Sequence, residues 1–264
     1  MSKEFKQQYR LKVKKMQKNI FIGTSGYSYK HWYNGVFYPP ELPISKWLEY
    51  YCQFFNAVEL NVSFYRLPKQ ETFKGWYKRT PNNFTFAVKG SRFITHIKKL
   101  SNCDEPIDLF FSYVQELKEK VGVVLWQLPP NLHFERERID NFCRQLKKNA
   151  ISKNISQAFE FRHESWFCTE LYDIFKNYNF SLCIAHSKRW PYVEKATANF
   201  IYLRFHGGEE LYGSNYSNRE LKYWANKSKH WLEGGKSIYA YFNNDAYGFA
   251  IKNALKFREL LEKL

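Results

Sequence analysis

Charged and amide side chains stand two residues apart at the ends of several short apolar segments. The clearest pairs are Glu59 with Asn61, Glu160 with Arg162, and Arg204 with His206. Alternate residues of a β-strand point to the same face, so each pair faces one side while the residue between them packs on the other. Carboxylates and imidazoles transfer protons, and guanidinium groups bind anions. The spacing therefore predicts a polar pocket at the ends of strands.

The same alternation brings further polar residues to this end of the predicted strands. Lys89 and Gln127 end two other apolar segments, and Asn243 and Asp245 follow the last one. Each residue alone could be an ordinary surface or salt-bridged side chain at a strand end. Charged groups on several strands, converging on one end, are better explained by a shared functional site, because charges are rarely buried without partners.

Eight apolar segments, about thirty residues apart, alternate with amphipathic segments. We predict strands at residues 20–24, 57–61, 84–89, 122–127, 158–162, 180–185, 200–206 and 238–243. We predict helices at residues 45–55, 71–79, 107–119, 136–147, 169–177, 220–234 and 249–264. Such alternation is typical of a parallel sheet covered by helices, and eight repeats favour a closed (β/α)8 barrel of one α/β domain, residues 20–264.

Three connections depart from this regular pattern. The segment 187–198, between the sixth and seventh strands, is short and contains Trp190-Pro191, so we expect an irregular crossover there. Segments 25–44 and 90–106 are long enough to hold local structure of their own. Both follow the carboxyl ends of strands, where barrel enzymes carry their active sites.

The chain is strongly basic, with 41 Lys and Arg against 25 Asp and Glu in 264 residues, a net charge of +16. This balance is expected of a protein that meets nucleic acid or another polyanion. Lysines scattered over solvated helix faces are the alternative explanation. No segment approaches the roughly 20 apolar residues of a membrane-spanning helix. Five cysteines without a Cys-x-x-Cys pair predict reduced thiols and a cytoplasmic protein.

Residues 1–19 form a basic N-terminal tail with seven Lys or Arg and one acidic residue, Glu4. Apolar residues recur every three or four positions through this tail and up to Ile20, which predicts an amphipathic helix lying on a surface. A solvated arm is the alternative.

Seven segments, in order, resemble the motifs of the YecE-like family, known as domain of unknown function 72. They are Gly23-Thr-Ser-Gly-Tyr-Ser-Tyr29, Val58-Glu-Leu-Asn-Val-Ser-Phe-Tyr65, Phe86-Ala-Val-Lys-Gly-Ser-Arg-Phe-Ile-Thr-His96, Gln127-Leu-Pro-Pro130, Phe159-Glu-Phe-Arg-His-Glu-Ser-Trp166, Tyr202-Leu-Arg-Phe-His-Gly207 and Tyr241-Phe-Asn-Asn-Asp-Ala-Tyr-Gly248. The resemblance runs from about residue 20 to the C-terminus. It implies a TIM-barrel-like fold but no particular activity, and it does not include the basic tail.

Four residues from these strand ends and motifs are the candidates for catalysis. Glu59 and Glu160 could form a carboxylate pair, one ionised as the base and one protonated as the acid. His163 or His206 could take either role. In the alternative, Glu160 only neutralises a neighbouring arginine and holds it in place.

The remaining candidates would bind the substrate. They are Asn61, Tyr65, Lys89, Arg92, His96, Gln127, Arg162, Trp166, Arg204, Asn243, Asn244 and Asp245. The cations among them suit a phosphate or carboxylate. Aromatic residues near the predicted loops, such as Tyr29 and Phe64, could stack on a base or sugar.

A divalent metal is compatible with the residue types but not favoured. Ligand-type side chains occur at His96, Glu160, His163, His206 and Asp245. No two histidines have a tight ligand spacing, and the nearby cations would repel a metal ion. The other histidines, including His31, are expected at the surface or behind the site.

The preferred interpretation is an enzyme that binds an anionic, phosphate-bearing substrate at the barrel mouth and performs hydrolysis or acid–base chemistry. The alternative is a non-catalytic module that binds nucleic acid or another polyanion through its basic surface. A polyanion binder should lose affinity steeply as salt rises, which a small-substrate enzyme need not do. The sequence determines neither the substrate nor the oligomeric state.

Overall fold

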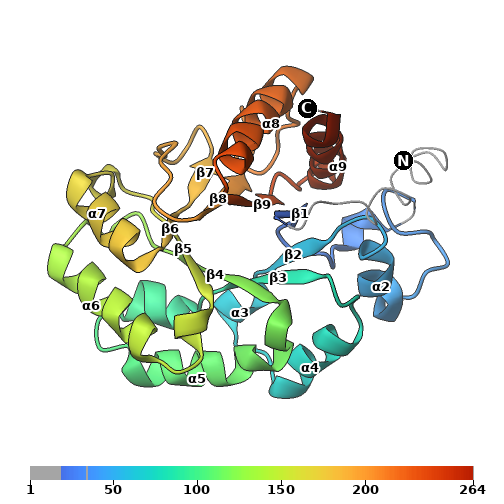
Figure 1. The fold of residues 1–264 in the computed structure, drawn as a ribbon. Coiled ribbons are helices and arrows are strands. Elements are labelled where there is room, and N and C mark those ends of the chain that lie inside the picture. The colour runs from blue at the N-terminus through green and yellow to red at the C-terminus, as the bar shows by residue number, and fades with distance from the viewer. Residues whose placement is uncertain (1–18, 34, 264) are drawn as a thin grey trace.

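The computed structural model describes residues 19–33 and 35–263, which form a ring of parallel strands surrounded by helices (Figure 1). The strands are β1 (Ile20–Thr24), β2 (Ala57–Leu60), β3 (Thr85–Lys89), β4 (Val121–Gln127), β5 (Ser156–Glu160), β6 (Ser181–Leu182), β7 (Ile184–His186), β8 (Phe200–Phe205) and β9 (Ser237–Phe242). They match the eight predicted segments, except that the sixth is divided at Cys183 into β6 and β7. The amphipathic helix predicted in the N-terminal tail lies outside the described residues.

The helices cover the outside of the ring (Figure 1). They are α2 (Trp47–Tyr51), α3 (Val62–Tyr65), α4 (Gln70–Lys78), α5 (Asp104–Val114), α6 (Arg136–Lys148), α7 (Thr169–Tyr178), α8 (Asn218–Glu233) and α9 (Phe249–Lys263). Their packing follows the apolar spacing of the sequence: in α6, for example, Ile139, Phe142, Cys143 and Leu146 are buried. The predicted helices are confirmed in position, and α3 is an addition that the sequence did not predict.

Local structure fills the two long connections, as predicted. Residues 25–44 contain the 3-10 turn η2 (Lys30–Trp32) and lead into η3 (Ile44–Lys46), and residues 90–106 contain the π-helical turn η4 (Phe93–Ile97). The crossover between β7 and β8 has no helix, which confirms the expected irregularity. The carboxyl ends of β1 and β3 are therefore followed by ordered structure.

The ring consists of two parallel sheets, ordered β1-β9-β8-β7 and β2-β3-β4-β5-β6. They adjoin at Cys183, whose N–H donates to the Phe159 carbonyl of β5 at 2.8 Å. They also adjoin between β1 and β2, where a single parallel bridge joins Ser25 and Glu59. The architecture is a TIM-barrel-like α/β fold whose backbone ladder is nearly absent at the β1–β2 seam.

Side chains supply hydrogen bonds at the β1–β2 seam. The Asn56 amide accepts from Ile22 N–H at 3.1 Å and donates to the Ile20 carbonyl at 2.7 Å. The Tyr51 hydroxyl accepts from Thr24 N–H at 2.9 Å. Buried backbone groups need partners, so these two side chains replace ladder bonds that the strands do not make with each other. A side chain at Gly23 would not fit here, since its Cβ would lie 2.0 Å from a β2 carbonyl oxygen.

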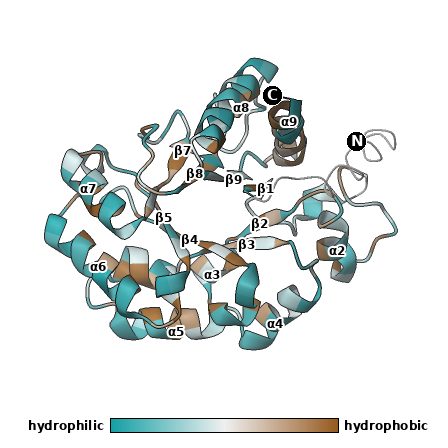
Figure 2. Cartoon of the chain, in the orientation of Figure 1, coloured by the Kyte–Doolittle hydropathy of each residue, from teal (hydrophilic) through white to brown (hydrophobic). Residues whose placement is uncertain are grey.

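The core has an outer and an inner part. The outer part packs helices against the strands, and Figure 2 shows hydrophilic residues mainly on the outward sides of those helices. Inside the ring, small residues such as Ala57, Ala87 and Ala158 face Tyr202 and Tyr241 from β8 and β9. This pairing of small with large side chains fills the barrel interior below its carboxyl end. In the described chain, no helix is both long and apolar enough to span a membrane.

Candidate functional site

A pocket of about 710 Å³ opens at the carboxyl ends of the strands. It is lined by Tyr29, His31, Asn61, Phe64, Tyr65, Lys89, Arg92, His96, Gln127, Pro130, Arg162, Arg204, Tyr212, Asn243, Asp245 and Ala246. Ten of the predicted substrate-binding residues are among them. The pocket thus lies where strand alternation predicted it.

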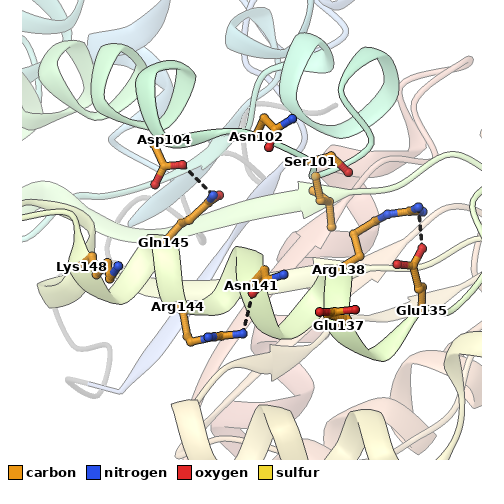
Figure 3. A pocket seen from close by; sticks show the side chains of 11 residues that line it. Ser101, Asn102, Asp104, Glu135, Glu137, Arg138, Asn141, Arg144, Gln145 and Lys148 are labelled. Carbon is orange, nitrogen blue, oxygen red and sulfur yellow. Dashed lines mark hydrogen bonds and ion pairs between the residues drawn. The ribbon is translucent and has the colours of Figure 1, made fainter.

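A second hollow, of about 480 Å³, lies on the outer surface between α6 and the start of α5 (Figure 3). Its polar side chains bind one another: Arg138 pairs with Glu135 at 2.5 Å, and Gln145 donates to Asp104 at 2.7 Å. Arg138 Nε and Gln145 Oε1 are buried without a partner among the described residues, but the other contacts join neighbouring side chains on the helix surface, and we treat this hollow as a surface groove.

The floor of the strand-end pocket is a buried ion-pair cluster centred on Arg204 of β8. Its Nη2 lies 2.7 Å from Glu59 Oε1 on β2, and its Nη1 lies 2.5 Å from Glu160 Oε2 on β5. The three residues are at most 1% exposed. A guanidinium group keeps its proton in proteins, so Arg204 is a fixed positive charge between two carboxylates.

Other side chains occupy the remaining carboxylate oxygens of this cluster. Ser25 and Tyr202 donate to Glu59 at 2.7 and 2.8 Å. Arg162 donates to Glu160 Oε1 through Nε at 2.7 Å and Nη2 at 2.5 Å. Every carboxylate oxygen in the floor therefore has a partner.

This geometry corrects the predicted division of roles between Glu59 and Glu160. Burial alone would raise both pKa values, but Arg204 lowers the pKa of Glu59, and Arg162 and Arg204 lower that of Glu160 well below its usual range. Both groups are ionised, and neither is a protonated acid. The arrangement favours the alternative in which Glu160 holds the arginines in position.

His206 also lies in the floor, fully buried, rather than in contact with the pocket. Burial lowers its pKa to about 4, against the opposing effect of Glu160, so the imidazole is neutral near pH 7. The Asn243 amide donates to Nδ1 at 3.1 Å, which turns Nε2 toward Glu160 at 3.6 Å. The predicted catalytic role of His206 is corrected accordingly, because it has no exposed surface.

One wall of the pocket is cationic. Lys89 ends β3 with its Nζ 4.0 Å from the ring centroid of Phe64, and Arg162 lies against the Trp190 ring at 4.6 Å. Burial first, and Arg204 second, lower the pKa of Lys89 to about 7. Arg92 stands exposed at the rim of the same wall.

His96 belongs to the same wall and comes from η4. Burial, and then the charge of Lys89, lower its pKa to about 4, so the ring is neutral near pH 7. Its Nδ1 lies 2.9 Å from the Thr95 hydroxyl. His96 therefore contributes a neutral hydrogen-bonding group to this wall and not a positive charge.

The other wall contains Asp245, which follows β9. Its Oδ1 accepts from the Trp32 indole and its Oδ2 lies by His31 Nε2, both at 2.8 Å. Burial raises the pKa of Asp245 to about 6, while Trp32 and His31 oppose the rise. His31 was expected at the surface or behind the site; its side chain is 43% exposed, and it also lines the pocket. The residue lies in the connection after β1, where strand alternation gives no orientation.

Besides the floor residues Glu59, Glu160 and His206, three predicted site residues do not line this pocket. His163 stacks on His133 with ring centroids 3.8 Å apart and accepts from Ser165 N–H. Trp166 is buried and donates to the Leu132 carbonyl at 2.6 Å. Asn244 is buried and donates to the Ser214 carbonyl at 2.9 Å. Each of the three holds a loop in place, and the structure brings none of them to the pocket.

Amide and aromatic groups complete the lining. Asn61 Oδ1 is buried and, among the described residues, has no hydrogen-bond partner, so it is available to a donor on a ligand. The Gln127 amide donates to the Leu128 carbonyl at 2.7 Å, and Tyr65 is 79% exposed at the rim. Tyr212, which the sequence analysis missed, also faces the pocket, from the connection after β8.

Within the part of the chain that the structure describes, no three His, Cys, Asp or Glu side chains gather closely enough to hold a metal ion. The predicted metal-ligand types are divided between the floor, the two walls and, for His163, a loop outside the pocket.

The fold and this site define a TIM-barrel-like α/β protein with a polar pocket at the carboxyl ends of its strands. The model of the family described as "Protein of unknown function DUF72" matches residues 21–264. The chain belongs to the DUF72 family, as its motifs predicted.

Relatives and solved structures agree with this assignment. The chain is 27% identical to UPF0759 protein YunF of Bacillus subtilis, over 92% of this chain and 95% of that protein. It is 33% identical to UPF0759 protein YecE of Escherichia coli K12, over 42% and 38% of the two chains. A DUF72 family crystal structure from Thermotoga maritima superposes with a TM-score of 0.81 and 31% identity, over 92% and 99%. Another from Enterococcus faecalis, 20% identical over 92% and 95%, has the same fold with a TM-score of 0.77.

Proposed function

We propose that this pocket binds a small anionic, phosphate-bearing substrate and performs acid–base chemistry on it. The observation that carries the proposal is the polarity of the pocket. Lys89, Arg92 and Arg162 converge on one wall, and the carboxylate nearest that wall, Glu160, is already held by two arginines. An anionic group is the ligand that this wall would attract.

The opposite wall supplies a group for proton transfer. A general acid or base works best when its pKa is near the working pH. Asp245, with its pKa raised to about 6 by burial, meets this condition and has His31 as a hydrogen-bonding neighbour. We therefore assign proton transfer to Asp245 and His31 rather than to the floor residues Glu59, Glu160 and His206.

Calorimetric titration with inorganic phosphate and with small sugar phosphates tests the binding step. Arg92→Gln should weaken binding roughly 10-fold or more, since a hydrogen bond to a charged group contributes about 1.5 to 3 kcal/mol. Arg144→Gln is the matched control, because Arg144 is an arginine in the surface groove on α6. Equal affinities of the two variants would contradict the proposed anion site.

The competing function is binding of nucleic acid through the basic surface. Titration of a short duplex and of a sugar phosphate at several salt concentrations separates the two. A small ligand should lose little affinity as salt rises, whereas a polyanion that neutralises many charges should lose affinity by orders of magnitude. Tight duplex binding that does not respond to Arg92→Gln, without sugar phosphate binding, would favour the polyanion module.

A further inference from the structure

We propose that Lys89 is a nucleophile that forms a Schiff base with a carbonyl group of the substrate. This inference rests on the proposed function and makes it more specific. The substrate class is then a small aldehyde or ketone that carries a phosphate or carboxylate group.

The Lys89 amine lies in a desolvated part of the pocket. Lys89 is the last residue of β3, and its side chain lines the pocket while the residue is only 8% exposed. Its Nζ lies over the apolar face of Phe64 at 4.0 Å. In the described chain, no carboxylate lies within ion-pair distance of this Nζ. A desolvated amine beside other cations is the arrangement that activates lysine for Schiff-base chemistry.

The acidic side chains nearest Lys89 are already paired with arginines. Glu59 and Glu160 act electrostatically on Lys89, but their oxygens are held by Arg204 and Arg162. The arginines cannot give up their protons, whereas a lysine can. Near pH 7, Lys89 is therefore the cation of this cluster that can lose its proton, in line with its pKa of about 7.

Lys120, a second buried lysine next to β4, has different surroundings from Lys89. Its Nζ donates to the carbonyl oxygens of Tyr77 and Thr80, both at 2.8 Å, and to the Thr80 hydroxyl at 3.2 Å. An ammonium group has three protons to donate, and here each has an acceptor. Lys120 is built as a structural cation, and Lys89 is not.

The covalent step is balanced without a cofactor. The Lys89 Nζ lone pair attacks the carbonyl carbon, and the C=O π electrons move to the oxygen, which takes up a proton. The nitrogen loses a proton, the hydroxyl group leaves as water after protonation, and the nitrogen lone pair forms the C=N bond of a protonated imine, whose remaining N–H proton is lost to give the neutral imine. Amine and carbonyl compound thus give an imine and water.

The pocket contains groups for the anionic end of such a substrate and for the following proton transfer. Arg92 and Arg162 would bind the phosphate or carboxylate. A protonated imine withdraws electrons from the adjacent carbon, so a proton on that carbon can pass to a base. Asp245, with His31, is the base that the opposite wall provides.

Reductive trapping tests the inference. The full chain is incubated with dihydroxyacetone phosphate or with pyruvate in the presence of cyanoborohydride, which delivers hydride to the imine carbon while water supplies the proton. Intact mass and peptide mapping should then show one adduct per chain, at Lys89. The rate should rise as the pH passes about 7, where the amine becomes neutral. Lys120 serves as an internal reference and should remain unmodified.

Two variants separate this inference from the proposed function. Lys89→Arg keeps the positive charge but cannot form an imine, so it should bind phosphate compounds and lose the adduct; Lys89→Met should lose the adduct too. Wild-type protein that binds sugar phosphate but gives no adduct with either compound would overturn the inference alone. Adducts spread over surface lysines, unchanged in Lys89→Met, would also overturn it. Absence of both binding and adduct would overturn the inference and the proposed function together.

Discussion

The floor and the cationic wall of the pocket contain similar residue types in opposite circumstances. In the floor, Arg204 and its two glutamates are almost fully buried, and each carboxylate oxygen has a partner. In the wall, Lys89 is nearly as buried but lies against the ring of Phe64. Burial costs a charge its hydration in both places, but only the floor replaces it with opposite charges. The floor therefore has fixed charges, and the wall has one that can be removed near neutral pH.

The largest expected effect comes from breaking the floor. Arg204→Met leaves Glu59 and Glu160 buried with fewer partners, and loss of one member of a buried ion pair costs about 3 to 5 kcal/mol. Urea denaturation should show a correspondingly lower free energy of unfolding. Arg92→Met is the control and should change it by less than about 0.5 kcal/mol, because Arg92 is exposed. Similar values for both variants would contradict a structural role of the floor.

The pH dependence of stability should also separate the two regions, with a smaller change per pH unit. The folded-state pKa of Lys89, about 7, is below its ordinary value of 10.5. Between these values the unfolded chain binds a proton that the native chain lacks, so stability rises with pH by at most about 1.4 kcal/mol per unit. The difference in free energy of unfolding between the wild-type protein and Lys89→Met should show this rise from pH 7 upward. A flat difference would show that the Lys89 pKa is not lowered.

The contribution of the floor to stability should change at acidic pH instead. The pKa values of Glu59 and Glu160 are lowered in the folded state, so their contribution is complete above the ordinary value of 4.5 and is lost as the pH falls through the folded values. Wild-type protein should lose stability below that pH more steeply than Glu160→Gln. Equal acid slopes would contradict the ionised floor.

The smallest effect on ligand binding is expected outside both regions, at His163. His163→Ala removes a stack on His133 and the acceptor for Ser165 N–H, with a stability cost of about 1 kcal/mol typical of a cap. Sugar phosphate affinity and Lys89 adduct formation should stay unchanged in calorimetry and trapping. A large loss of either would show that His163 takes part in binding or catalysis.

Strand alternation was enough to find the floor but not to assign its chemistry. Because side chains alternate along a strand, Glu59, Glu160 and Arg204 were correctly expected on one face. How deep each would lie, and whether two carboxylates would share one arginine, depends on strands far apart in sequence. Protonation depends on those same partners, so the predicted acid could not be assigned from the sequence.

Connections between elements limited the rest of the prediction. Alternation stops where a strand stops, so His31 and Tyr212 had no expected direction, and α3 lies directly after the predicted strand 57–61, where no helix was predicted. The sequence also did not predict that the sixth strand divides at Cys183 into β6 and β7, because an apolar segment does not show where a strand changes from one neighbouring strand to another. The family motifs, by contrast, included Asp245 as a candidate but could not show that it binds Trp32.

The β1–β2 seam has a consequence for how the chain is assembled during synthesis. Strands β2 to β6 pair in the order in which they are made, each with the next. Strand β1 is made before them, yet its ladder partner is β9, which is made last. Asn56 and Tyr51 bond the backbone of Ile20, Ile22 and Thr24, on the edge of β1 that faces β2. The opposite edge of β1, which includes Ser25 N–H, bonds β9 and has no strand to pair with until β9 is made, so the last strand of the chain closes an edge that could otherwise pair with another chain.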